Sequence, residues 1–283
     1  MRFLIAIVSI VVMAMANENG NLTLSKSLQM LENKQLSKEE MVDKLMEISG
    51  INFQIENFVQ KIQNQVLSSL NTLPPEAAQK VEEALLNAYD ENSFKNSIKK
   101  EILKALSPSE LKELLLWYKG ELGTKVTEVE NIDLNDEDYQ LIFDKIKDLN
   151  NTSPSRKELI KELIQKNKTL DFAKRLRKAL MRVAISLYSP YLPKEEIDKI
   201  IERRFKGEEK RLEDFYTAFY LYIYNKLSDK DLKGYIDFIS KSSYQALKDS
   251  FENAFIEKYI KSSREFFSKL KEISIKNNKM QLK

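Results

Sequence analysis

The sequence predicts an all-α protein, built from tandem duplicated helical-bundle modules with a long C-terminal helix. Of its 283 residues, 42% are hydrophobic and 31% are charged, with only six glycines and six prolines. Such a chain is too apolar to be disordered and has too few turn formers for a β-sandwich. Apolar residues recur at helical spacing, and one order of motifs recurs 118 to 121 residues further along.

The first 16 residues predict a signal peptide. Arg2 precedes an apolar stretch over residues 3–13, which is followed by the small-x-small cleavage site Ala14-Met15-Ala16. The stretch is shorter than the roughly 20 residues that span a bilayer. The alternative is an uncleaved N-terminal anchor. We expect a soluble mature chain that begins at Asn17 and is periplasmic or secreted.

Helical module one is expected over residues 17–131. After a short leading helix, apolar residues repeat at intervals of three and four through two further helices. Pro74-Pro75 ends one helix and suits the first turn of the next. Ser107, Pro108 and Glu110 form a capping-box pattern, which predicts a helix over 109–129. The positions that carry this pattern are Leu24, Leu28 and Leu31, then Met41, Leu45, Ile48, Ile51, Ile55, Phe58, Val59, Ile62 and Val66.

A linking helix is expected over 132–153. Asp133 to Asp138 precede an apolar run that contains Tyr139 and Ile142, so these acidic residues read as a helix start that caps free N–H groups. The spacing to Asp144 also suggests a calcium loop, but the sixth position is Asp138 rather than glycine. We therefore favour capping and expect no metal site.

Module two, over 154–256, repeats the order of module one. Leu73-Pro74 matches Leu192-Pro193, Phe94 matches Phe215, and Trp117 matches Phe238. Leu106-Ser107-Pro108 likewise matches Leu227-Ser228-Asp229, and Ser37 to Val42 resembles Ser155 to Ile160. These matches predict a duplication, although helical sequences also resemble one another at arbitrary offsets. The C-terminal helix and tail follow over 257–283, with Phe255, Tyr259, Phe266 and Leu270 on one stripe.

The segment Trp117 to Val126 carries a resemblance to a known family. Trp117-Tyr118, Gly120 and Gly123 follow a Leu-Ser-x-x-Glu-Leu helix start, and this combination resembles a bacterial family of exported helical proteins catalogued as domain of unknown function, number twenty fifty-nine. The likeness is good in the first copy and degenerate in the second, where the Tyr and the Gly are lost. Gly120 stands where the family usually has Ser. The resemblance implies a helical fold and export, and no activity.

Gly120 and Gly123 lie three residues apart, so a single helix would present both on one face. Two glycines within a helix cost about 1 kcal/mol each relative to alanine. A face without side chains allows close approach of another helix, which we favour over a ligand contact.

The chain has no cysteine and no histidine, which removes disulfides, thiol chemistry, the usual zinc ligands and every His-based triad. No phosphate-binding glycine loop is present, and no feature pairs two carboxylates in a cleft. We therefore name no catalytic residue and expect no cofactor.

Charge is divided unevenly along the chain. Residues 17–150 hold 15 lysines, no arginine and 24 acidic residues, whereas residues 151–283 hold 30 basic and 19 acidic residues. Either the halves face each other, or the basic half meets an anionic partner. The densest basic cluster is a candidate for weak contact with an anionic membrane surface, or the solvated face of a core helix. We expect no nucleic acid partner. The cluster consists of Lys174, Arg175, Arg177, Lys178 and Arg182.

A stripe of tyrosines is the main difference between the copies. Tyr216, Tyr220 and Tyr224 follow one another at four-residue spacing, and Tyr222 adds a fourth ring. Module one has Lys95, Lys99, Leu103 and Glu101 at the matching positions. A helix that is apolar all round is buried on more than one side, and tyrosine suits a half-wet surface. The stripe could pack on the other module or the C-terminal helix, form a homodimer contact, or line a groove for a ligand or partner peptide.

These observations favour a non-enzymatic protein-interaction module whose partner is an unknown protein or a second copy. The alternative is a carrier that holds an apolar or amphipathic ligand between helices, which a closed cavity beside the tyrosine stripe would favour. A carboxylate-dependent enzyme is a third class, and it would need two acidic groups with separated pKa values in one pocket.

Overall fold

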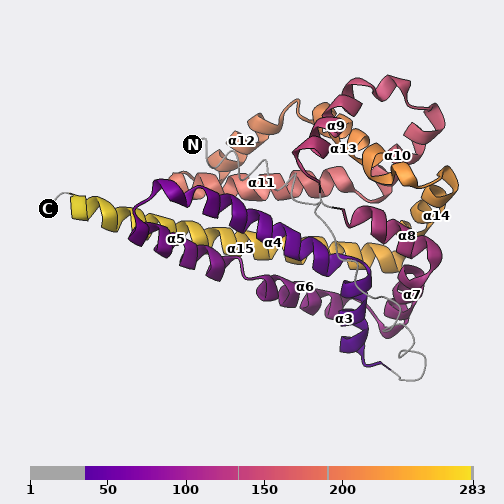
Figure 1. Ribbon diagram of the computed structural model, residues 1–283, viewed down its shortest axis with the longest axis horizontal. Helices are drawn as coiled ribbons and strands as arrows, with labels where there is room; N and C mark the ends of the chain where they lie inside the picture. The colour runs from indigo at the N-terminus through magenta and orange to yellow at the C-terminus, as the bar shows by residue number, and fades with distance from the viewer. Residues whose placement is uncertain (1–35, 133, 190, 282–283) are drawn as a thin grey trace.

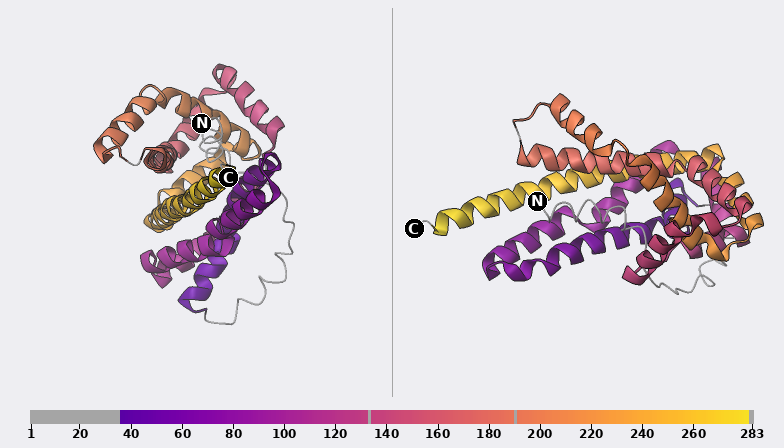
Figure 2. Two further views of the ribbon diagram at one scale, coloured as in Figure 1. Left: turned by 90° about the vertical axis from the view of Figure 1, so that its left-hand side faces the viewer. Right: turned by 90° about the horizontal axis from the view of Figure 1, so that it is seen from above.

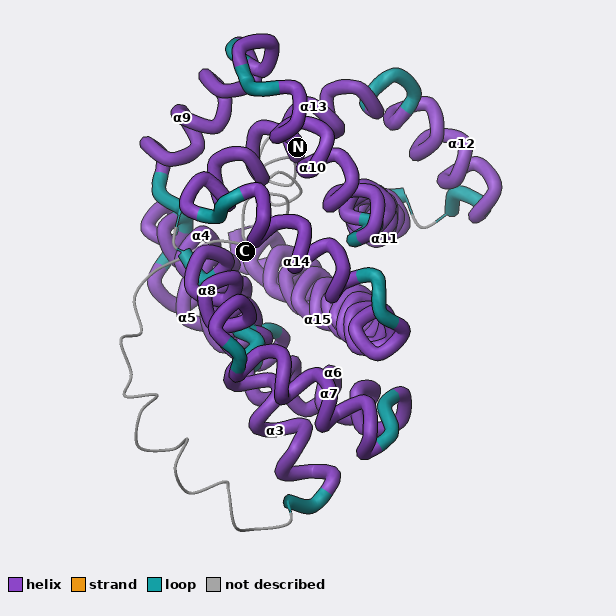
Figure 3. Tube along the Cα trace, turned by 90° about the vertical axis from the view of Figure 1, so that its right-hand side faces the viewer, coloured by secondary structure: helices purple, strands orange, loops and turns teal. Residues whose placement is uncertain are grey.

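The computed structural model describes residues 36–132, 134–189 and 191–281, and the regular elements in these ranges are all helices, as predicted (Figure 3). The expected signal peptide and the leading helix around Leu24 to Leu31 lie outside these ranges. Within them, no helix combines the length and the apolar character needed to cross a membrane.

Module one forms a layer of short helices. The turn between α3 and α4 has the left-handed Gly50 (φ 79°), and a Cβ there would lie 2.3 Å from Asn131 Oδ1. Glycine suits this turn because it adopts the left-handed conformation without strain, and a Cβ there would displace the Asn131 side chain. The helices are α3 (Lys38–Ile48), α4 (Ile51–Ser68), the 3₁₀ turn Leu70–Thr72, α5 (Pro75–Ala88), α6 (Glu91–Ala105), α7 (Pro108–Lys119) and α8 (Glu121–Glu130).

After the linking helix, module two has a similar order of helices. The turn between α10 and α11 again holds a left-handed residue, Lys168 (φ 49°), and α14 again begins with a capping box, at Ser228. The common origin of the two modules stays a prediction, which the recurring order supports. The helices are α9 (Asp136–Lys147), the 3₁₀ turn Leu149–Asn151, α10 (Pro154–Lys166), α11 (Thr169–Tyr188), α12 (Lys194–Phe205), α13 (Glu209–Ile223), the 3₁₀ turn Tyr224–Lys226, α14 (Asp229–Ile239) and α15 (Ser242–Gln281).

Local capping explains where several helices begin. Ser107 Oγ accepts a hydrogen bond from the Glu110 backbone N–H, and the Ser107 backbone N–H donates to the Glu110 carboxylate, which confirms the predicted capping box. At α9, Asn135 and Asp138 form the same arrangement, so the acidic segment does cap a helix. Each such cap contributes about 1 kcal/mol.

The prediction of one helix over 109–129 is wrong, because the chain breaks at Gly120. Gly120 has an extended backbone (ψ 160°) and is the residue that precedes α8. Gly123 then lies in the first turn of α8, where a Cβ would be 2.1 Å from the Trp117 carbonyl oxygen. The close approach is therefore between α8 and the last turn of α7, at a sharp corner, and the two glycines do not form one face of a helix.

Helix α15 runs between the two modules along most of the molecule (Figures 1 and 2). Its aromatic stripe completes the core of module one: the Phe58 ring lies 4.6 Å from that of Phe255 and 4.9 Å from that of Tyr259. The Tyr89 hydroxyl forms a buried hydrogen bond with Ser263. The expected boundary between residues 256 and 257 therefore falls inside one continuous helix, which belongs to both modules.

Module one reaches into module two in return, through α7 and α8. The Trp117 ring stacks on that of Phe238, its predicted counterpart, with centroids 3.6 Å apart and planes 2° from parallel. Lys125 of α8 pairs with Asp231 of α14 at 2.5 Å. The modules are thus interlocked, and the place where they meet is enclosed on several sides.

Candidate functional site

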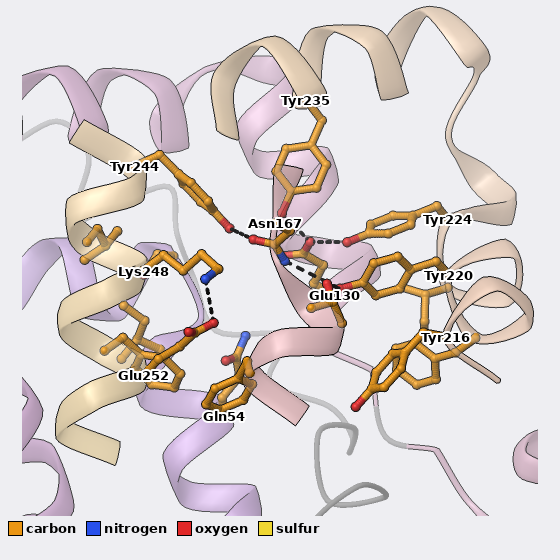
Figure 4. Close-up of a pocket in the computed structure, with 18 of the residues that line it drawn as sticks. Gln54, Glu130, Asn167, Tyr216, Tyr220, Tyr224, Tyr235, Tyr244, Lys248 and Glu252 are labelled. Atoms are coloured by element: carbon orange, nitrogen blue, oxygen red, sulfur yellow. Dashed lines mark hydrogen bonds and ion pairs between the residues drawn. The ribbon is translucent and has the colours of Figure 1, made fainter. Parts of the chain in front are cut away.

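A cavity of about 190 Å³ lies where the modules meet, and we refer to it as the junction cavity. Its walls come from the α3–α4 turn, α8, the α10–α11 turn, α13, α14 and α15, so segments from both modules build it (Figure 4). The lining is mainly aromatic, with a few polar and charged groups. The lining residues that matter here are Ser49, Gln54, Glu130, Asn167, Tyr216, Phe219, Tyr220, Tyr224, Tyr235, Tyr244, Lys248, Phe251 and Glu252.

Three of the four predicted tyrosines line this cavity. Tyr220 and Tyr224 are buried, and Tyr216 is partly buried beside them. Tyr222 points away toward α9, where its hydroxyl donates to Asp138. The stripe therefore faces the interior of the protein. This orientation agrees with two of the hypotheses for the stripe, packing within the protein and lining a groove for a ligand.

The same positions in module one are built differently. Lys95 pairs with Glu56 at 2.5 Å and Lys99 pairs with Asp43 at 2.6 Å, in partly exposed ion pairs. At the positions predicted to match in module two, the Tyr216 and Tyr220 rings contact each other, and the Tyr220 hydroxyl bonds to Thr169. The change from ion pairs to rings is what creates an aromatic wall.

Hydrogen bonds fix the orientation of the tyrosine rings. The Tyr220 hydroxyl lies 2.8 Å from Thr169 Oγ1, and the Tyr244 hydroxyl donates to Asn167 Oδ1 at 3.1 Å. Burial raises the pKa of Tyr220 to about 12, so its hydroxyl is neutral at physiological pH. The cavity wall is therefore a rigid set of uncharged rings.

Glu130, at the C-terminal end of α8, brings a carboxylate to the cavity. The hydroxyls of Tyr224 and Tyr235 both donate to its Oε1, at 2.5 and 2.7 Å. Burial raises the pKa of Glu130, although the two tyrosine hydrogen bonds oppose this effect by stabilising the charged form. In the part of the chain that the structure describes, no lysine or arginine pairs with Glu130.

A second charged group lies across the cavity on α15 (Figure 4). Lys248 and Glu252 are 8% and 6% exposed, and their charged atoms are 2.7 Å apart. Arg175 of α11 approaches the other oxygen of Glu252, at 3.5 Å. Burial raises the pKa of Glu252, while Lys248 and Arg175 favour its charged form. Glu252 is thus balanced by cations, in contrast to Glu130.

Two polar groups at the cavity have no hydrogen-bond partner within the described ranges. Ser49 is only 6% exposed and its hydroxyl is unpaired. The Lys248 ammonium has charge balance from Glu252, but it makes no hydrogen bond of good geometry. Unpaired buried polar groups cost about 1–3 kcal/mol each, so a bound molecule or water that pairs with them would stabilise the protein.

One of the predicted signature residues lines the cavity, and the others lie close to it. Tyr118 lines the cavity, whereas Trp117 is in the stack that joins the modules. Gly120 and Gly123 form the α7–α8 corner, which sets the direction of α8 and hence the position of Glu130 at its end.

The predicted basic cluster lies on α11, away from the centre of the cavity. Most of its members pair with carboxylates: Lys174 with Glu209, Arg177 with Glu208, and Arg182 with Asp198. Lys178 lies over the Phe205 ring. These pairs reduce the net charge that the cluster presents. Contact with an anionic membrane surface stays a prediction.

Sequence patterns did not single out the charged residues of the cavity. Glu130 and Lys248 each follow a core residue directly (Val129 and Leu247), and Glu252 follows the partly buried Phe251, so helical periodicity places all three at the edge of the apolar face. Their burial depends on a second module covering that edge. The only signal available was a charge beside an apolar stripe, which is common on surface helices.

The geometry suits binding better than the other chemistries considered. Over the described ranges, no three acidic side chains converge as a metal site would require. Burial raises the pKa of Glu130 and of Glu252.

Comparisons with known proteins give no relative for this chain: no family model, no curated protein and no solved structure matches it. The resemblance of Trp117 to Val126 to an exported bacterial family stays a prediction. The function must be argued from the junction cavity itself.

Proposed function

We propose that this protein is a non-enzymatic carrier that binds one small ligand in the junction cavity. The observation that carries the proposal is a cavity of about 190 Å³ beside Tyr220 and Tyr224, lined by residues of both modules. Small-molecule sites are typically concave and mostly apolar, with a few converging polar groups. The unpaired Ser49 hydroxyl and the Glu130 carboxylate are such groups.

The location of the tyrosines favours a carrier over a module that binds proteins through this stripe. Tyr220 is 8% exposed and Tyr224 is 3% exposed, so another protein cannot reach their rings without opening the junction. A homodimer or a protein partner would need a different surface. The signal-peptide pattern of residues 1–16 supports a periplasmic or secreted site of action.

A cavity-filling substitution tests the proposal. Ser49→Met places a flexible apolar chain in the cavity and removes an unpaired hydroxyl, so the fold should tolerate it. Ser109→Met, at an exposed position, is the matched control. Native mass spectrometry of the exported chain should detect a ligand that denaturation removes, in the wild type and in Ser109→Met. Ser49→Met should lack it. A bare wild-type chain, or equal retention in Ser49→Met, contradicts the proposal.

A further inference from the structure

The charged residues around the junction cavity are unevenly placed: of its two carboxylates, Glu130 and Glu252, only Glu252 has cations beside it. Lys248 lies 2.7 Å from Glu252, and Arg175 adds a second positive charge 3.5 Å from the same carboxylate. Glu130 has no basic side chain within ion-pair distance in the described part of the chain. A buried carboxylate without a counter-charge is costly, so the missing positive charge is a property of the site that a ligand could supply.

The Glu130 carboxylate is also positioned to pair with a cation. Its Oε1 accepts both tyrosine hydrogen bonds, from Tyr224 and Tyr235, which fix its position. Its Oε2 receives no hydrogen bond from any described residue. This oxygen is therefore the free acceptor of a positioned, partly buried group at the cavity wall.

Aromatic rings surround the same space. Tyr216, Tyr220 and Tyr224 follow one another along the wall with ring centroids 6.4 and 5.3 Å apart, and the Tyr235 ring lies 6.0 Å from that of Tyr224. The face of an aromatic ring is negative and attracts cations, most strongly where water is excluded. Rings and carboxylate therefore favour the same sign of charge in a ligand.

An anionic ligand fits these observations less well. Lys248 is the one basic residue among those that line the cavity within the described ranges, and Glu252 already balances its charge. An anion would face an unneutralised Glu130 as well as the negative faces of the rings. The volume of the cavity limits the size of the ligand. About 190 Å³ is the volume that roughly six water molecules occupy in liquid water.

We infer that the ligand of the junction cavity is a small organic cation, an amine or quaternary ammonium compound whose charged nitrogen lies against Glu130 and the tyrosine rings. The inference rests on the proposed carrier function and specifies its ligand class. On binding, Glu130 gains an adjacent cation, as Glu252 already has in Lys248.

Two probes of equal shape test the inference by isothermal titration calorimetry on the mature chain. The first is choline, and the second is its neutral carbon analogue, in which carbon replaces the charged nitrogen. We expect choline to bind at least tenfold more tightly, since a desolvated cation–π contact alone corresponds to up to about thirtyfold. Equal affinity of the two probes, or tighter binding of the neutral one, would overturn the inference.

Variants assign the effect to named groups. Glu130→Gln should lower choline affinity at least tenfold and change the affinity of the neutral probe less than twofold, while Glu128→Gln, exposed on the same helix, should change neither. Tyr216→Phe keeps the ring and should keep binding, whereas Tyr216→Leu should weaken choline binding several-fold. Unchanged choline affinity in Glu130→Gln overturns the inference.

The result also separates this inference from the proposed function. If the exported chain retains a ligand that Ser49→Met excludes, but choline does not bind better than its neutral analogue, the carrier stands and the cationic ligand is wrong. If no ligand is retained and neither probe binds, both are wrong.

Discussion

Replacing Tyr235 by phenylalanine tests whether the two tyrosine hydroxyls hold the Glu130 carboxylate. Tyr235 is 3% exposed and its hydroxyl donates to Glu130 Oε1 at 2.7 Å. Phenylalanine keeps the ring and leaves no cavity larger than the lost hydroxyl. Hydrogen bonds to charged groups contribute about 1.5–3 kcal/mol, so we expect Tyr235→Phe to lower the free energy of unfolding by about 2 kcal/mol at neutral pH.

Urea unfolding of a double-mutant cycle measures this coupling. In the Glu130→Gln background, the amide oxygen still accepts the hydrogen bond but carries no charge, so Tyr235→Phe should cost only about 1 kcal/mol. Tyr191→Phe is the control, because Tyr191 is 81% exposed and should change stability by less than about 0.5 kcal/mol. An equal cost of Tyr235→Phe in both backgrounds would refute the role assigned to the charged carboxylate.

Three further perturbations test other parts of the account. Burial raises the pKa of Glu130 above 4.5, so the wild-type free energy of unfolding should decline as pH rises from that value through the folded pKa. Glu130→Gln should reduce this decline when the free energy is measured by urea unfolding at a series of pH values. An equal decline in the variant would contradict the raised pKa of Glu130. Gly123→Ala should lower the free energy of unfolding by about 2 kcal/mol or more, because its Cβ would lie 2.1 Å from the Trp117 carbonyl oxygen. Gly120→Ala, whose Cβ would have its nearest contact at 3.1 Å, should change it by less than about 1 kcal/mol. Similar melting temperatures of the two variants would contradict the close approach of Gly123 to α7. The Lys125 ammonium lowers the pKa of Asp231 to about 2, so the stability that the Asp231 carboxylate contributes is present above pH 3.8 and is lost toward pH 2. Asp231→Asn should lower the free energy of unfolding by about 1 kcal/mol at neutral pH and should reduce the loss of stability in acid. Identical acid denaturation curves of the variant and the wild type would contradict this contribution of Asp231.

Much of the fold could be predicted because its elements are specified locally. Helical periodicity and the caps at Ser107 and Asn135 placed helices where the structure has them. Such signals depend on neighbouring residues and survive without knowledge of the tertiary structure.

The break at Gly120 was missed because periodicity continues across it. Leu114, Tyr118 and Val126 are all buried, so the apolar pattern alone cannot distinguish one helix from two that meet at a corner. The distinguishing fact is the contact between Gly123 and the Trp117 carbonyl, which is a three-dimensional constraint.

The candidate site was predicted in part. Tyr216, Tyr220 and Tyr224 stood out because they replace two charges and a leucine of the other module. Glu130 and Lys248 did not, since a charged residue beside an apolar stripe is usually solvated. Only the packing of α8 and α15 between the modules buries these groups together.

A crystal structure of the protein purified directly from the exported fraction, without refolding, tests the carrier proposal most directly. The account predicts electron density for one small non-protein molecule in the junction cavity, with a positively charged nitrogen near Glu130 Oε2 and the ring of Tyr216 or Tyr220. Ordered water alone in an otherwise unchanged cavity, or tyrosine side chains that close the space, would contradict it.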